Sequence, residues 1–145
     1  MCEQAQANPR VVIGRLQRAI NEHDLEAFVA CFAPDYRSEQ PLHPNWAFRG
    51  SDQVRENWGA VFGDIPDIRA ELLRCTADGE VVWAEWHWWG NRRDGTRLQM
   101  RGVTIMGVRA GRIGWGRLYM EPVEELGADI GTGVRRMTGG DEQEG

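Results

Sequence analysis

The sequence predicts an α+β fold in which three helices cover one face of a curved, mostly antiparallel sheet. Apolar residues recur at helical spacing in the first part of the chain, and from Ile68 onward they alternate with polar residues as in strands. The turn dipeptides Asp78-Gly79, Asp94-Gly95 and Ala110-Gly111 divide this second part into strands that fold back on one another. Helices followed by such a meander are typical of an α+β domain.

Helix start and stop signals define the three helices. We expect Asn8 to cap the first helix. Pro9 is suited to its first turn, because the amide that proline lacks would be unpaired there anyway. Asp24 caps a second, shorter helix, which we expect Pro34 to end. A third helix begins with Ser51 as its cap.

The strands are read from alternation and from the turns between them. A short extended segment covers residues 35–42, and the meander consists of residues 68–76, 81–89, 97–109 and 112–122. We expect one domain over residues 9–126. Residues 127–145 are rich in glycine and charge and show no period, which predicts a flexible tail.

Composition excludes several classes of function. The net charge is −5 with acids and bases interspersed, which argues against nucleic-acid binding. No apolar run reaches membrane-spanning length, and the N-terminus lacks the apolar region of a signal peptide, so we expect no membrane contact and a cytoplasmic location. The three cysteines lack metal-ligand spacing, and no glycine-rich motif precedes a helix, so we expect neither a metal nor another cofactor.

The stretch Val81–Trp89 holds the main functional signal. Alternation places Trp83, Glu85, His87 and Trp89 on one strand face, and Val82, Ala84, Trp86 and Trp88 on the other. A carboxylate and an imidazole between two indoles cost free energy unless they are paired or functional. We therefore expect Glu85 and His87 to point into the concave side of the sheet as a catalytic acid–base pair. The alternative is a buried hydrogen-bonded pair that only shapes the cavity.

Several short segments, taken in their order, resemble a known family. They are Ala19–Leu25, Phe32–Tyr36, Phe48-Arg49-Gly50 and Tyr119–Pro122. Together they resemble the nuclear-transport-factor-two-like superfamily in its SnoaL-like branch. The resemblance implies a cone in which the sheet wraps a helix around a pocket. Such proteins include polyketide cyclases, ketosteroid isomerases, limonene-type epoxide hydrolases, dehydratases and non-catalytic dimeric modules.

The resemblance also tests specific mechanisms. It places the catalytic positions of the epoxide-hydrolase branch at Glu85, His87 and Leu118, and Leu118 is apolar where that mechanism needs a carboxylate. Gln40 stands where the ketosteroid-isomerase branch has its aspartate base. His43, Glu85 and His87 lack a tight metal-binding spacing, so we expect no metal site.

The resemblance and strand alternation together predict the surroundings of the catalytic pair. We expect a substrate to contact these side chains: Ser38, Gln40, His43, Trp58, Trp83, Trp89, Met100, Thr104, Leu118 and Met120. Such a site suits a compact hydrophobic or aromatic molecule with one polar handle.

The opposite sheet face is predicted to be an interface. An uncovered apolar patch usually marks one, and the resemblance implies dimers that join sheet to sheet. We therefore expect a homodimer through a group of apolar side chains: Trp86, Trp88, Val103, Ile105, Trp115 and Tyr119.

Two functions remain open from the sequence. The first is a cofactor-independent small-molecule enzyme, a cyclase, isomerase, dehydratase or hydrolase, that works by general acid–base chemistry. The second is a non-catalytic module of the same fold that binds a hydrophobic ligand or serves dimerisation.

Overall fold

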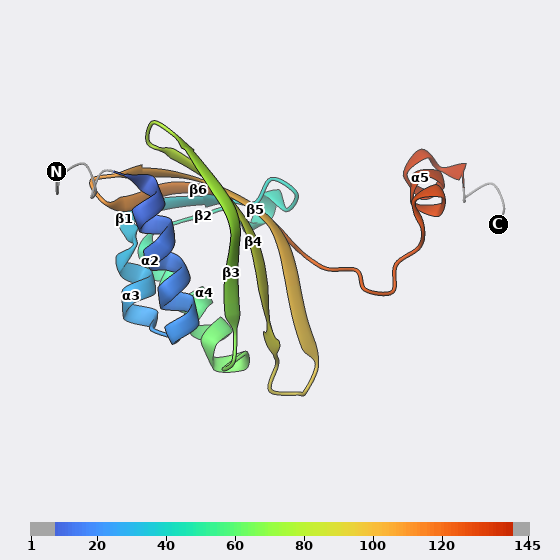
Figure 1. Cartoon of the computed structure of the whole chain (residues 1–145), viewed down its shortest axis with the longest axis horizontal. Helices are drawn as coiled ribbons and strands as arrows, with labels where there is room; N and C mark the ends of the chain where they lie inside the picture. The colour runs from blue at the N-terminus through green and yellow to red at the C-terminus, as the bar shows by residue number, and fades with distance from the viewer. Residues whose placement is uncertain (1–7, 141–145) are drawn as a thin grey trace.

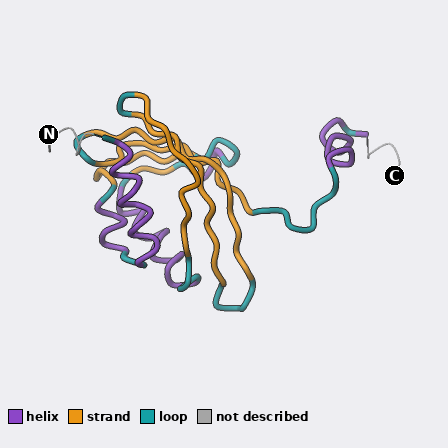
Figure 2. Tube along the Cα trace, in the orientation of Figure 1, coloured by secondary structure: helices purple, strands orange, loops and turns teal. Residues whose placement is uncertain are grey.

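The computed structural model describes residues 8–140 and confirms the α+β class (Figure 1). Three helices lie against one face of a six-stranded sheet (Figure 2). The helices are α2 (Pro9–Glu22), α3 (Leu25–Ala30) and α4 (Ser51–Asp64), and a short 3-10 turn, η1, spans Pro44–Trp46. The strands are β1 (Phe32–Glu39), β2 (Phe48–Arg49), β3 (Arg69–Asp78), β4 (Val81–Asn91), β5 (Arg97–Arg109) and β6 (Arg112–Pro122).

The sheet has the order β2-β1-β6-β5-β4-β3. Strands β3 to β6 form the predicted antiparallel meander, and β1 joins β6 in parallel at the other side. The predicted bounds of β5 and β6 coincide with the observed ones. Both residues of the turn between them, Ala110 and Gly111, have positive φ, of 53° and 76°. This backbone matches the twist of the flanking strands.

Local signals placed the starts of the three helices to within one residue. The Asn8 side chain accepts a hydrogen bond from the Arg10 amide, and the Asp24 side chain accepts one from the Ala27 amide, as expected of caps. The predicted cap at Ser51 is wrong by one residue: the cap is Gly50, whose φ of 103° suits glycine.

The predicted role of Pro34 is also wrong. Helix α3 ends at Ala30, and Pro34 lies within β1, between Phe32 and Arg37, where the pairing with β6 shifts register. Proline has no amide to donate to a sheet, and it is tolerated where the ladder is interrupted.

The core lies between α2 and the inner face of the sheet. Val12, Ile13 and Ile20 on α2 are fully buried, as are Val82 and Trp86 on β4. Burial of these side chains supplies most of the stabilisation of such a two-layer fold.

Two amides attach α2 to β3. The side chains of Gln17 and Asn21 both donate to the carbonyl oxygen of Ala70, at 3.2 and 3.0 Å. The Ala70 amide in turn donates to Asn21 Oδ1 at 2.7 Å. These bonds set the position of α2 along the sheet.

The two faces of β4 are the reverse of those predicted. The face with Val82, Ala84, Trp86 and Trp88 is buried beneath the helices, whereas Trp83 is 47% exposed on the outer side. The alternation itself is as predicted. The inner face is the apolar one because the helices must bury apolar side chains against it, and the cavity is the unfilled part of the same layer.

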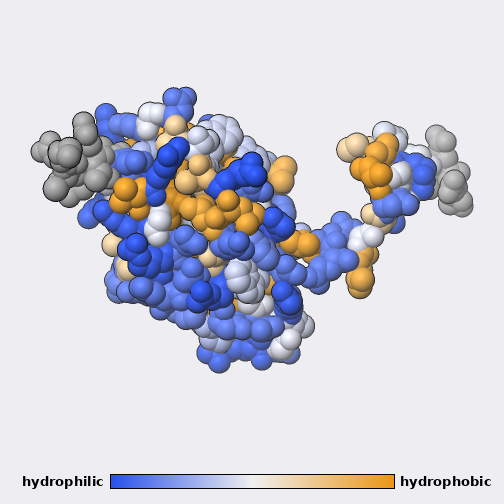
Figure 3. Space-filling view, viewed as in Figure 1, coloured by the Kyte–Doolittle hydropathy of each residue, from blue (hydrophilic) through white to orange (hydrophobic). Residues whose placement is uncertain are grey.

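A further helix, α5 (Ile130–Thr138), lies within the segment that was predicted to be a flexible tail without a period. Asp129 caps it by accepting from the Thr132 amide at 2.9 Å. The chain leaves the sheet after β6, and α5 stands apart from the body of the protein (Figure 1). Its apolar side chains, including Ile130 and Met137, are exposed (Figure 3). Flexibility of residues 127–140 stays a prediction, and residues 141–145 lie outside the described part.

Within residues 8–140, no helix combines the length and the apolar character that are needed to cross a membrane.

Candidate functional site

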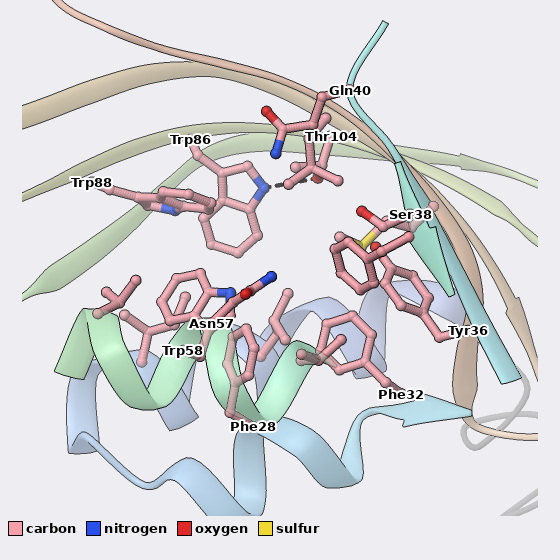
Figure 4. A pocket seen from close by; sticks show the side chains of 17 residues that line it. Phe28, Phe32, Tyr36, Ser38, Gln40, Asn57, Trp58, Trp86, Trp88 and Thr104 are labelled. Carbon is pink, nitrogen blue, oxygen red and sulfur yellow. Dashed lines mark hydrogen bonds between the residues drawn. The ribbon is translucent and has the colours of Figure 1, made fainter. Parts of the chain in front are cut away.

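A cavity of about 210 Å³ lies between the inner face of the sheet and the helices (Figure 4). Helices α2, α3 and α4 form one wall, and strands β1, β4, β5 and β6 form the other. Its lining consists of Leu16, Ile20, Phe28, Phe32, Tyr36, Ser38, Gln40, Phe48, Val54, Asn57, Trp58, Val61, Trp86, Trp88, Thr104, Met106 and Leu118.

Aromatic rings form much of the wall. Trp58 on α4 stands edge to face against Trp88 on β4, with ring centroids 5.5 Å apart and planes at 79°. The ring centroids of Phe28 and Trp58 are 4.3 Å apart, and those of Trp86 and Trp88 are 6.1 Å apart. Such pairs are mutually stabilising and have few accessible rotamers. The cavity therefore has rigid, flat, apolar walls.

The polar side chains of the lining are neutral. They are Tyr36, Ser38, Gln40, Asn57 and Thr104, and no Asp, Glu, Lys, Arg or His is among the described residues that line the cavity. A charged ligand buried here would lack a countercharge, which is energetically unfavourable. The lining thus selects for uncharged molecules.

The hydroxyl of Thr104 is already used by the protein. It accepts a hydrogen bond from the indole nitrogen of Trp86 at 3.0 Å, and both residues are fully buried (Figure 4). This bond fixes the Trp86 ring in the cavity wall and satisfies its N–H group.

Tyr36 is a protonated donor at neutral pH. Burial raises the pKa of its phenol to about 12, and a hydrogen bond with Ser38 acts in the opposite direction. The tight packing of the Tyr36 hydroxyl against Gly116 on β6 leaves no room there for a side chain. Tyr36 and Ser38 therefore form a hydroxyl pair at one side of the cavity (Figure 4).

The indole nitrogen of Trp88 lacks a partner. Among the described residues it is the buried side-chain nitrogen or oxygen that makes no hydrogen bond. Trp88 lines the cavity. Unsatisfied buried donors are rare and unfavourable in folded proteins, so an acceptor on a bound molecule would remove a deficit here.

The structure brings half of the predicted ligand-contacting residues to the cavity. Ser38, Gln40, Trp58, Thr104 and Leu118 line it. Met100 and Met120 pack against the apolar core but lie outside the lining.

The prediction that Glu85 and His87 point into the concave side is wrong. They share the outer face with Trp83 and Trp89, since they alternate with the buried residues of β4. Each has a different partner: Glu85 lies 3.4 Å from Arg74, and His87 Nε2 lies 2.8 Å from Gln99 Oε1. A catalytic role for this pair in the cavity has no geometric support.

His43 also lies outside the cavity lining. Its Nε2 is 2.7 Å from Glu121 Oε1, and its ring stacks on Trp46 with centroids 3.9 Å apart and planes at 14°. The loop after β1 is thereby attached to the end of β6. The residue is a structural contact of this loop in the described structure.

Sequence reasoning missed much of the lining. The missed residues include Phe28, Tyr36, Asn57, Trp86 and Trp88. One available signal was the wholly apolar character of the Trp86 and Trp88 strand face, which a helix-covered sheet requires on its inner side.

Cys31 is buried and free. Burial raises the pKa of its thiol to about 11, so it remains protonated at neutral pH. This environment suits a structural cysteine, not a nucleophile.

Comparisons with known proteins identify the family. A model of the SnoaL-like domain matches residues 13–114, well over half of the chain, and the chain therefore belongs to the SnoaL-like family. This finding confirms the predicted resemblance. No curated protein matches the sequence.

Solved structures share the fold. The structure resembles IdmH from Streptomyces antibioticus, a candidate polyketide cyclase, at 22% identity and a TM-score of 0.68, with 79% of this chain and 92% of that chain covered. A Mycobacterium tuberculosis protein in complex with estradiol-17beta-hemisuccinate matches at 17% identity and a TM-score of 0.67, with coverage of 77% and 92%. An LEH-like (limonene-epoxide-hydrolase-like) epoxide hydrolase, also from M. tuberculosis, matches at 20% identity and a TM-score of 0.67, with 81% of this chain and 84% of that chain covered. At these identities the likeness shows the fold alone.

Proposed function

We propose that the cavity binds a compact, uncharged hydrophobic or aromatic molecule with an oxygen-bearing handle. The observation that carries the proposal is the lining itself: rigid aromatic walls with a few neutral hydrogen-bonding groups and no ionised side chain. Ligand sites commonly combine a mostly apolar wall with a few polar groups that fix orientation. The M. tuberculosis neighbour binds a steroid hemisuccinate, whose ring system supports a hydrophobic ligand for this fold.

The hydrogen-bond donors of the cavity indicate which polar group the ligand carries. The Tyr36 phenol is protonated at neutral pH, Ser38 is 4% exposed beside it, and the Trp88 indole N–H is unpaired. Each can donate to a carbonyl, ether or hydroxyl oxygen. We therefore assign Tyr36 and Ser38 as the groups that bind the handle.

A second candidate is catalysis on the same ligand without a cofactor. The Tyr36 phenol favours it, because a buried neutral donor can stabilise negative charge that develops on a substrate oxygen. Confinement between indole walls would also hold a flexible substrate in a reactive conformation. The cyclase and epoxide-hydrolase neighbours support this reading of the fold. Turnover, as opposed to recovery of unchanged ligand, distinguishes it from simple binding.

The binding proposal predicts an effect of Ser38→Ala. Loss of one hydrogen bond to the handle should raise the Kd for 2-naphthol about three- to tenfold. Glu85→Gln should leave the Kd unchanged, because the Glu85 side chain lies on the outer face and is not part of the cavity lining. Isothermal titration calorimetry of the three proteins makes the comparison. Equal affinity in all three, or a loss confined to Glu85→Gln, would contradict the assignment.

We also propose that the outer sheet face joins two copies of the chain. Apolar side chains from three adjacent strands meet on this face: Trp83, Val103, Ile105, Trp115 and Tyr119. Trp83 is 47% exposed and Tyr119 is 36% exposed. No helix among the described residues covers this outer face. An apolar group of this kind on an uncovered sheet face fits a two-fold, sheet-to-sheet contact. Trp86 and Trp88, predicted for this surface, belong to the inner face instead.

The dimer proposal predicts an effect of Ile105→Arg. Ile105 is paired with Trp83 and Arg117 on the outer face, so a new cation there would be buried beside a like charge. The dissociation constant of the dimer should rise at least about tenfold in sedimentation velocity. Leu42→Arg, at an exposed loop position, serves as the control. A wild-type chain that sediments as a monomer at all concentrations would refute the interface.

A further inference from the structure

A second hollow, of about 310 Å³, adjoins the cavity. It is lined by Gln40, Trp46, Phe48, Gln53 and Asn57. Three of these residues, Gln40, Phe48 and Asn57, also line the inner cavity. The two spaces therefore share a boundary, and a molecule longer than the cavity would extend into the outer hollow.

Carboxamides dominate the polar surface of this boundary. Gln40 reaches in from the strand side and Asn57 from α4, so that the two amides lie on opposite sides of the space (Figure 4). Gln53 Nε2 donates to Asn57 Oδ1 at 2.8 Å. This bond occupies the Asn57 oxygen and leaves its NH₂ group as the available donor. The Gln40 carboxamide has no side-chain bond to another described residue, so its donor is available too.

An aromatic ring forms one wall of the outer hollow. Trp46 is 56% exposed, and its indole is held by the stacked His43 ring. His43 is in turn bonded to Glu121 at 2.7 Å, which attaches the ring pair to the end of β6. The outer wall is therefore held in place before any ligand binds, and less ordering is needed on binding.

No Asp, Glu, Lys, Arg or His is among the described residues that line either space. The boundary thus offers two amide donors and no charge. We propose that the outer hollow is a second subsite for an uncharged, hydrogen-bond-accepting extension, such as an ester or amide, on a molecule whose ring system occupies the inner cavity. This inference rests on the proposed function of the inner cavity. It adds which chemical group the site prefers in the part of the ligand that extends beyond that cavity.

Three naphthalene probes separate the two spaces. They are 2-naphthol, methyl 3-(6-hydroxy-2-naphthyl)propanoate and the matching carboxylate, each titrated into the full chain by calorimetry. The ester should bind about three- to tenfold more tightly than 2-naphthol, because it gains a hydrogen bond at the boundary. The carboxylate should bind at least about tenfold more weakly than the ester, since the subsite offers no countercharge.

Two variants test the residues. Trp46→Ala, which removes a side chain that lines the outer hollow but not the inner cavity, should weaken the ester about three- to tenfold and 2-naphthol less than twofold. Asn57→Leu, which keeps the side-chain size but removes the amide at the boundary, should also weaken the ester about three- to tenfold. Asn45→Ala, a carboxamide on the same loop outside both linings, is the matched control and should bind both probes as the wild type does.

The outcomes separate the inference from the proposed function. If 2-naphthol binds but the ester gains nothing and Trp46→Ala affects both probes equally, the second subsite is refuted and the inner cavity stands. Tighter binding of the carboxylate than of the ester would also refute it. If no probe binds the wild-type chain, the proposed function of the inner cavity fails, and the subsite fails with it.

Discussion

Replacement of Trp86 by alanine should lower the free energy of unfolding by about 3–5 kcal/mol. Trp86 is fully buried between the sheet and the helices, and its indole nitrogen donates to Thr104 at 3.0 Å. The substitution removes a large apolar side chain, opens a void and leaves the Thr104 hydroxyl without its donor. Urea unfolding monitored by circular dichroism measures the change.

The control for Trp86 is another tryptophan of the same strand. Trp83 is three residues away and 47% exposed on the outer face, so Trp83→Ala should lose less than about 1 kcal/mol. All proteins should be compared in the same assembly state, because an interface adds to apparent stability. A larger loss for Trp83→Ala than for Trp86→Ala would reverse the assignment of the two faces of β4.

Replacement of Gly102 by alanine should destabilise the fold by about 3 kcal/mol or more. A Cβ atom at Gly102 would lie 2.0 Å from the carbonyl oxygen of Tyr119 on the neighbouring strand β6. The obstacle is backbone, so it can move only if the pairing of β5 with β6 is distorted. Overpacking of this kind commonly costs about 1–3 kcal/mol, and it costs more where the neighbouring atoms cannot move. The loss at Gly102 should therefore lie at or above about 3 kcal/mol.

Gly114→Ala is the matched control for Gly102→Ala. Gly114 lies on β6 of the same sheet, and a Cβ there would meet nothing within 4 Å. The free energy of unfolding of Gly114→Ala should differ from that of the wild type by less than about 0.5 kcal/mol. The same urea denaturation series covers both variants. Similar losses at the two positions would mean that close approach of the strands is not what requires glycine at Gly102.

The cavity also narrows the chemistry open to this member of the SnoaL-like family. The apolar Leu118 lines it, as does the neutral Gln40, and no carboxylate or imidazole is among its described lining residues. Proton abstraction by such a group within the cavity therefore has no candidate. Hydrogen-bond donation by Tyr36, together with confinement of the ligand, is what the lining can supply.

The helices and strands could be predicted because their signals are local. The Asn8 and Asp24 caps and the turn at Ala110-Gly111 depend on backbone geometry within a few residues, and all three appear as expected. The helix α5 was not predicted, although Asp129 caps it and Ile130, Val134 and Met137 recur at helical spacing, because the glycines at 131 and 133 lower its helix propensity.

Alternation along β4 separates Glu85 and His87 from Trp86 and Trp88 whatever surrounds the strand, so the difference between its two faces could be predicted from the residues alone. Which face is turned inward depends on how the helices pack against the sheet. The helices must bury apolar surface, so they cover the tryptophan face, and the ligand cavity is the space that their side chains leave unfilled. The acid and the imidazole are left on the outside, where water and polar neighbours satisfy them.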